Sequence, residues 1–73
     1  MYKIYSKDNC SYCVAAKNLL DSKNIPYTEY KLGKDVTTEY LLEIVPGARS
    51  VPQIFLDETY IGGYDKLVSF LKE

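Results

Sequence analysis

Cys10 and Cys13 are the only cysteines of this chain and the residues whose type and spacing best suit chemistry. Ser11 and Tyr12 separate them, and the pair lies between an apolar strand pattern and a helical pattern. The start of a helix carries unpaired N–H groups and a partial positive charge, which favour an anion such as a thiolate. We therefore expect Cys10 to be the more acidic and more nucleophilic thiol. Cys13 follows one turn later on the same face, so the pair can close a disulfide with little backbone movement.

A structural role for this disulfide is disfavoured by its short span. A bond between Cys10 and Cys13 closes a loop of four residues, which constrains the unfolded chain very little. The chain has no histidine, which excludes a cysteine hydrolase that needs an imidazole base. Two thiolates also supply only half of a structural zinc site. The pattern favours a working dithiol that exchanges with other disulfides.

Composition sets limits on the kind of protein. The 73 residues predict one domain, 1–73, and 47% hydrophobic content is enough for a small core. A net charge of −1 gives no basic footprint for nucleic acid. No apolar stretch approaches the about 20 residues that span a bilayer, and residues 1–5 resemble a strand rather than a signal peptide. We expect a monomeric cytoplasmic protein that binds neither nucleic acid nor membrane.

The hydrophobic pattern predicts four strands and three helices, which position the cysteines. Strands are expected over 2–5, 27–32, 53–56 and 59–61, and helices over 11–23, 35–45 and 64–71. Asn24 and Pro26 end the first helix, and Asp35, Thr37 and Thr38 are candidate N-caps of the second. The order β-α-β-α-β-β-α implies a parallel pair of strands followed by a hairpin. We predict an α/β fold with one four-stranded mixed sheet covered by three helices.

Three segments carry a resemblance to a known family. They are Cys10-Ser11-Tyr12-Cys13, Ser50-Val51-Pro52 and Gly62-Gly63-Tyr64-Asp65. In this order and on these elements the chain resembles the glutaredoxins over essentially its whole length, and most of all the short bacterial and bacteriophage members. The resemblance implies a thioredoxin-like fold and a glutathione-dependent thiol–disulfide oxidoreductase. Cys10 would attack protein disulfides or glutathione mixed disulfides, Cys13 would resolve the intermediate, and glutathione would be a co-substrate rather than a bound cofactor.

The resemblance also implies a glutathione site built largely from backbone. It implies a cis Val51–Pro52 bond, although the base rate favours trans, and the Val51 backbone would pair with glutathione like an added strand. Gly63, Tyr64 and Asp65 would meet the γ-glutamyl end at the start of the last helix. Asp65 could instead be a first-turn acid that the helix dipole favours, although we favour the binding role.

Three further residues are expected to line the same groove. Lys7 would face the glycyl carboxylate of glutathione, although it could also be an ordinary solvated lysine in a loop. Tyr12 would line the groove, and helical spacing also lets it pack partly on the core. Arg49 would be a second partner for a carboxylate.

The sequence departs from the family pattern at three places. Ser11 stands where proline is commonest, which leaves open a second function: a [2Fe–2S] cluster held between two subunits by Cys10 and glutathione. Lys66 stands where many members have an acid, and Thr38-Glu39 offers no cation at the start of the second helix. Both departures predict weaker glutathione binding.

Other partners follow from the family alone. Thioredoxin itself is disfavoured, because the chain lacks tryptophan and a Gly-Pro pair between the cysteines. A glutaredoxin-like protein reduced by thioredoxin reductase remains an alternative. The resemblance suggests ribonucleotide reductase among the possible disulfide-containing or glutathionylated protein partners.

Overall fold

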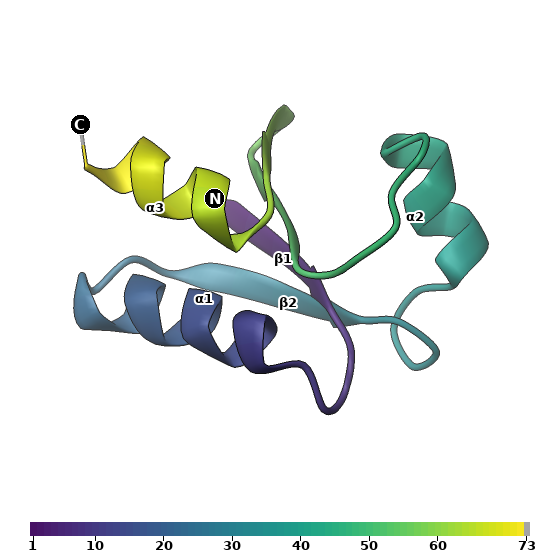
Figure 1. Cartoon of the computed structure of the whole chain (residues 1–73), viewed down its shortest axis with the longest axis horizontal. Coiled ribbons are helices and arrows are strands. Elements are labelled where there is room, and N and C mark those ends of the chain that lie inside the picture. The colour runs from purple at the N-terminus through teal and green to yellow at the C-terminus, as the bar shows by residue number, and fades with distance from the viewer. Residues whose placement is uncertain (73) are drawn as a thin grey trace.

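The computed structural model describes residues 1–72, and its elements follow the predicted order β-α-β-α-β-β-α (Figure 1). The elements are β1 (Tyr2–Ser6), α1 (Ser11–Ser22), β2 (Tyr27–Lys31), α2 (Thr38–Ile44), β3 (Gln53–Leu56), β4 (Thr59–Gly62) and α3 (Tyr64–Leu71). Every predicted element is present, and most boundaries differ from the prediction by only one or two residues. Within residues 1–72, no helix is long and apolar enough to cross a membrane.

The four strands form one mixed sheet in the order β2-β1-β3-β4, which confirms the predicted fold class. β1 and β2 are parallel, whereas β3 is antiparallel to both of its neighbours. The β3–β4 hairpin turns through Asp57 and Glu58, because Leu56 pairs with Thr59. Tyr5 pairs with Gln53, so the last residues of β1 lie beside the first residues of β3. The loops after β1 and before β3 therefore meet at one edge of the sheet.

Alternation along β1 divides the interior into two cores. Ile4 faces α1 and α3, which lie at the left of Figure 1, away from α2 at the right. That core has five side chains with no exposed surface: Ile4, Ala16, Leu20, Ile54 and Leu67. Tyr5 points to the opposite face and packs beneath α2 with Leu41 and Val45. Tyr5 also stacks on Tyr30, with ring centroids 5.2 Å apart.

The end of α1 is set by a local hydrogen-bond motif. Asn24 has φ 58°, the left-handed conformation that asparagine tolerates. Its N–H donates to the Asp21 carbonyl at 3.0 Å, and the Ile25 N–H donates to the Leu20 carbonyl at 2.9 Å. These two bonds form a Schellman motif, and Ile25 then packs against the core. Asn24 therefore ends the helix as the sequence predicts.

Leu20→Ala tests the core between the sheet and the α1–α3 layer. Leu20 is fully buried, so its truncation leaves a cavity and should lower the free energy of unfolding by about 2–5 kcal/mol. Leu42→Ala is the matched control, because Leu42 is 41% exposed and should cost less than about 1 kcal/mol. Urea unfolding followed by circular dichroism measures both. Equal losses in the two variants would contradict this description of the core.

Candidate active site

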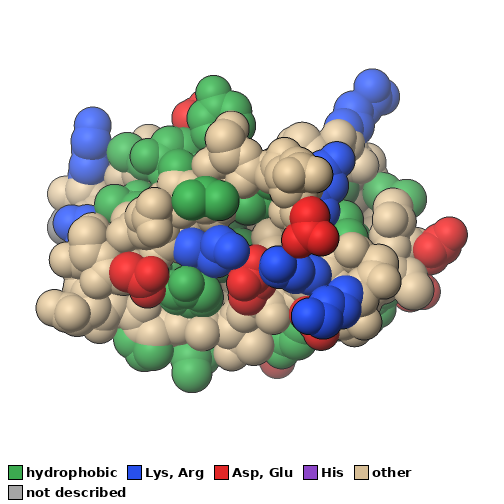
Figure 2. Space-filling view, turned by 90° about the horizontal axis from the view of Figure 1, so that it is seen from below, with side chains coloured by type: hydrophobic (Ala, Val, Ile, Leu, Met, Phe, Trp, Pro, Cys, Tyr) green, Lys and Arg blue, Asp and Glu red, His purple; other side chains and the backbone are tan. Residues whose placement is uncertain are grey.

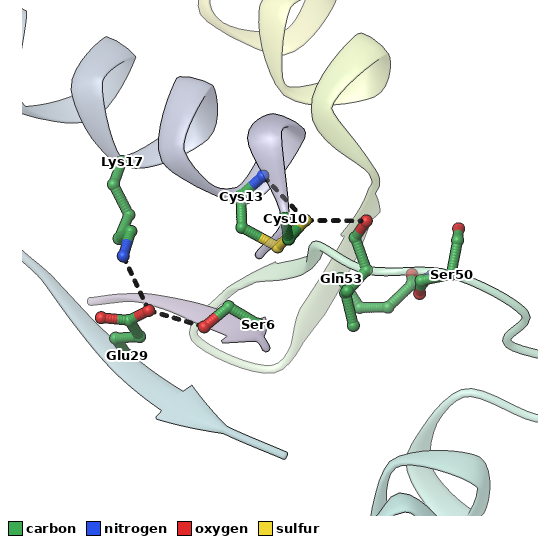
Figure 3. The surroundings of a disulfide bond; sticks show 8 residues. Ser6, Cys10, Cys13, Lys17, Glu29, Ser50 and Gln53 are labelled. Carbon is green, nitrogen blue, oxygen red and sulfur yellow. Dashed lines mark hydrogen bonds and ion pairs between the residues drawn. A yellow bond between two sulfur atoms is a disulfide. The ribbon is translucent and has the colours of Figure 1, made fainter. Parts of the chain in front are cut away.

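Cys10 and Cys13 form a disulfide at the start of α1, with their Cα atoms 5.2 Å apart (Figure 3). Cys10 is the N-cap, in an extended conformation, and its Sγ accepts the Cys13 N–H at 3.1 Å. The helix therefore begins where the sequence predicts, with a backbone donor aimed at the first sulfur. Cys13 is 1% exposed, whereas Cys10 is only half-buried. Cys10 is thus the sulfur that an incoming thiolate can reach.

The loop before Cys10 is held by a turn and an ion pair. Asn9 has φ 58° and turns the chain into the helix. Asp8 accepts a hydrogen bond from Lys31 Nζ at 3.0 Å, which ties the loop to β2. The hydrogen bond and charge of Lys31 hold the pKa of Asp8 below its usual value. Lys7 lies in this loop with its side chain exposed.

The Val51–Pro52 segment faces the first sulfur. The Val51–Pro52 bond is cis, as expected, and the Val51 carbonyl oxygen lies 3.6 Å from Cys10 Sγ. Gln53 fixes this loop, because its Nε2 donates to the Ser50 carbonyl at 2.8 Å. Tyr60 Oη in turn donates to Gln53 Oε1 at 2.5 Å. The β3–β4 hairpin therefore positions the backbone beside the disulfide.

Two open hollows, of about 400 and 420 Å³, meet at Ser50 and Val51. Lys7 and Arg49 line the first hollow, together with apolar side chains that include Leu41 and Leu42. The second hollow is lined by Tyr12, Ser50, Val51, Pro52, Gly63, Tyr64, Asp65 and Lys66. The structure thus brings together all eight residues that the sequence suggested for glutathione.

Ser50 is a groove residue that the sequence did not reveal. Ser50 lines both hollows, and its only sequence signal is its place directly before Val51-Pro52. Thr38, noted only for the missing cation, lines the first hollow. Leu41 is buried and Leu42 is 41% exposed, and nothing in the sequence marks either as a groove residue.

The start of α3 forms one wall of the second hollow. Gly62 has φ +126°, and a Cβ there would lie 2.7 Å from Lys66 Cγ, so the site requires glycine. Gly63 is the N-cap of α3 and contributes no side-chain hydrogen bond. The first N–H groups of α3 therefore have no acceptor from the cap side chain, and they are suited to a ligand carboxylate.

Tyr12 does not pack on the core as helical spacing allowed. Its side chain is 62% exposed, and its ring centroid lies 5.8 Å from that of Tyr64. The buried stripe of α1 is Cys13, Ala16 and Leu20. Tyr12 precedes Cys13 by one residue, which rotates it about 100° away from that stripe.

A partly buried ion pair lies on the sheet side of the disulfide, and the sequence analysis missed it (Figure 3). Lys17 Nζ donates to Glu29 Oε2 at 2.9 Å, and Ser6 Oγ donates to the same oxygen at 2.6 Å. Burial disfavours the charged form of Glu29, but the hydrogen bonds from Ser6 and Lys17 outweigh it and hold the pKa below its usual value. Ser6 itself has no exposed surface.

On the face of the molecule that Figure 2 shows, basic and acidic side chains are interleaved, and neither charge forms a patch of its own. Among residues 1–72, no three or more histidine, cysteine or acidic side chains gather where they would hold a metal ion.

A redox-active Cys-x-x-Cys disulfide at the start of the first helix of this fold defines a thioredoxin-like thiol–disulfide oxidoreductase. The sequence profile described as Glutaredoxin matches residues 3–61. Glutaredoxin 1 of Rickettsia felis is 39% identical over 72 residues, which cover 96% of this chain and 71% of the relative. Glutaredoxin 3 of Escherichia coli K12 is 38% identical over 65 residues, which cover 89% and 78%. The chain belongs to the glutaredoxin family.

Solved structures agree with this assignment. Glutaredoxin 1 from Francisella tularensis, complexed with cacodylate, matches with a TM-score of 0.80 and 31% identity, over 97% of this chain and 91% of that one. The buckwheat glutaredoxin–glutathione complex matches with a TM-score of 0.83 and 29% identity, over 97% and 67%. The predicted family and fold are therefore confirmed.

Glu29→Gln tests the charge of the buried pair. The pKa of Glu29 is lowered in the folded protein, so its charge stabilises the fold above the ordinary glutamate value of 4.5. That contribution is lost as the pH falls from there through the lowered folded value. Glu29→Gln should therefore lower the free energy of unfolding at pH 7, and the difference from wild type should shrink by pH 3. Urea unfolding at both values measures this; a difference that stays constant would contradict it.

Proposed function

We propose that this glutaredoxin reduces protein disulfides and glutathione mixed disulfides with electrons from glutathione. The observation that carries the proposal is the position of Cys10 Sγ, half-buried and 3.6 Å from the Val51 carbonyl, close to the residues where two hollows meet. A tripeptide disulfide bonded to Cys10 has backbone partners beside the sulfur and a hollow for each end. The relative solved with glutathione supports the choice of this thiol.

The proposed reaction begins with the Cys10 thiolate. It attacks the glutathionyl sulfur of a mixed disulfide, and the substrate thiol leaves with the electron pair of the broken bond. A second glutathione thiolate attacks the adduct on Cys10, which releases oxidised glutathione and restores the Cys10 thiolate. With a protein disulfide as substrate, the Cys10 thiolate first forms a disulfide with one substrate sulfur, and the other substrate sulfur leaves as a thiolate. Cys13 then attacks Cys10 Sγ, which releases the reduced substrate and closes the Cys10–Cys13 bond. The Cys13 N–H stabilises the Cys10 thiolate in each cycle.

We assign the two ends of glutathione to the two hollows. Lys7 and Arg49 in the first hollow suit the glycyl carboxylate. The uncapped N–H groups at the start of α3 suit the γ-glutamyl carboxylate, with Asp65 available for its ammonium. Val51 lies between them, where its backbone would pair with the cysteinyl residue.

Serine substitutions separate the two cysteines. Cys10→Ser should abolish exchange with glutathione mixed disulfides, because it removes the accessible nucleophile. Cys13→Ser should keep that activity and lose reduction of protein disulfides. The measurement is turnover of a glutathionylated peptide and of a disulfide-bonded protein, coupled to glutathione reductase. Equal loss of both activities in both variants would contradict the assigned roles. If the oxidised protein were reduced by thioredoxin reductase and not by glutathione, the proposed electron donor would be wrong.

Lys7→Gln tests the first hollow. Loss of an exposed cation from a carboxylate contact costs about 0.4–1 kcal/mol, so KM for the glutathionylated peptide should rise about two- to fivefold. The value of kcat should stay unchanged, since the sulfur chemistry is not touched. Lys23→Gln is the matched control, because Lys23 lies at the far end of α1. Steady-state kinetics at low ionic strength measures both, and an unchanged KM in Lys7→Gln would exclude this contact.

A further inference from the structure

The Ser6–Glu29–Lys17 group is more buried and better connected than an ordinary surface ion pair. The Lys17 and Glu29 side chains are 24% and 23% exposed, whereas Asp8, in the Lys31 pair, is 81% exposed. Ser6 is fully buried and shares the Glu29 oxygen that Lys17 binds. Three elements therefore converge on one carboxylate: β1, β2 and α1.

Lys17 belongs to the same helix face as Cys13. It follows Cys13 by four residues, a spacing that brings side chains into contact on a helix. Long helical side chains point back toward the N-terminus, which directs the Lys17 stem toward the Cys13 turn. Figure 3 shows Lys17 reaching from α1 toward the strands to meet Glu29, with Ser6 bonded to the same carboxylate. The spacing thus places Lys17 one turn from the buried cysteine, on the face of α1 that Cys13 occupies.

The proposed chemistry makes Cys13 an anion in a buried place. When Cys13 closes the disulfide, its thiol gives up a proton to solvent, and its thiolate attacks Cys10 Sγ of the mixed disulfide. The bond between Cys10 and glutathione breaks, and glutathione leaves with the electron pair. In the reverse direction, a glutathione thiolate attacks Cys10 Sγ, and the electron pair of the broken disulfide bond returns to the Cys13 sulfur. A charge on a 1% exposed sulfur is costly unless a cation is near.

We propose that Lys17 stabilises the Cys13 thiolate during opening and closing of the disulfide. Glu29, oriented by Ser6, is the positioning residue that binds the Lys17 ammonium while the Cys13 sulfur is neutral. The flexible lysine stem lets the ammonium move from the carboxylate to the sulfur when the thiolate forms. The inference rests on the proposed role of Cys13 as the resolving cysteine.

The size of the effect follows from the shift that a nearby cation causes. An opposite charge within contact range lowers a pKa by about 1–3 units. A lower pKa raises the thiolate fraction, while about half of that gain is lost as weaker nucleophilicity. Removal of the Lys17 charge should therefore slow disulfide closure about three- to thirtyfold.

A quenched reaction with oxidised glutathione separates the relevant steps. Reduced protein is mixed with oxidised glutathione, the reaction is quenched with acid, and the protein species are quantified by mass spectrometry. Appearance of the glutathione adduct reports attack by Cys10, and disappearance of the adduct reports closure by Cys13. Lys17→Gln should slow only the second step, and Lys17→Arg should restore its rate to within about threefold of wild type because it keeps the cation.

The Cys13→Ser background and a matched lysine control distinguish this role from a purely structural one. In Cys13→Ser protein, which performs only the first step, Lys17→Gln should have no effect. Lys23→Gln is the matched control, because it removes a lysine charge from the far end of the same helix and should change neither step. Glu29→Gln should slow closure less than Lys17→Gln, since the ammonium remains. Equal slowing of both steps by Lys17→Gln, or no slowing of closure, would overturn the inference. A wild-type adduct that never closes would instead refute the resolving role of Cys13.

Discussion

The site depends on one hydrogen bond, from the Cys13 N–H to Cys10 Sγ at 3.1 Å. This bond makes Cys10 the N-cap of α1, so the first sulfur lies outside the helix and the second lies inside its first turn. The same offset decides exposure, because Cys13 starts the buried stripe that continues with Ala16 and Leu20. Two cysteines three residues apart therefore differ in exposure: Cys10 is half-buried, whereas Cys13 is 1% exposed.

The sheet supplies what the helix cannot. The antiparallel pairing of β1 with β3 places the loop that carries Cys10 beside the Val51–Pro52 loop, although about 40 residues separate them in sequence. Gln53 and Tyr60 then anchor that loop from β3 and β4. The proposed ligand contacts therefore include backbone groups of Val51 and of the start of α3 as well as side chains. The departures at Thr38 and Lys66 lie along this groove, and neither disturbs the Cys10–Val51 contact.

The sequence predicted the elements well because their signals are local. Asn24 and the apolar spacing of α1 act within a few residues, and the two-residue gap between β3 and β4 dictates a hairpin. The groove residues followed from family motifs rather than from physics. The Lys17–Glu29 pair could not be predicted, because it requires the parallel register of β2 beside β1 and the rotation of α1 over both. Helical spacing alone left open whether Tyr12 packs partly on the core, because periodicity does not show where a buried stripe ends, and its ring is in fact 62% exposed.

The two sulfurs need different electrostatic support, and the fold offers each a different kind. Cys10 is close to solvent, so a neutral N–H donor and the helix dipole are enough to favour its thiolate. Cys13 has no comparable access to water, and a helix dipole acting within the first turn favours the sulfur at the cap more than the one inside. Any charge that Cys13 carries during exchange must therefore be met by a side chain from below. Lys17 can provide that charge only because Glu29 and Ser6 make its partial burial tolerable between cycles, which ties the resolving chemistry to residues on β1 and β2.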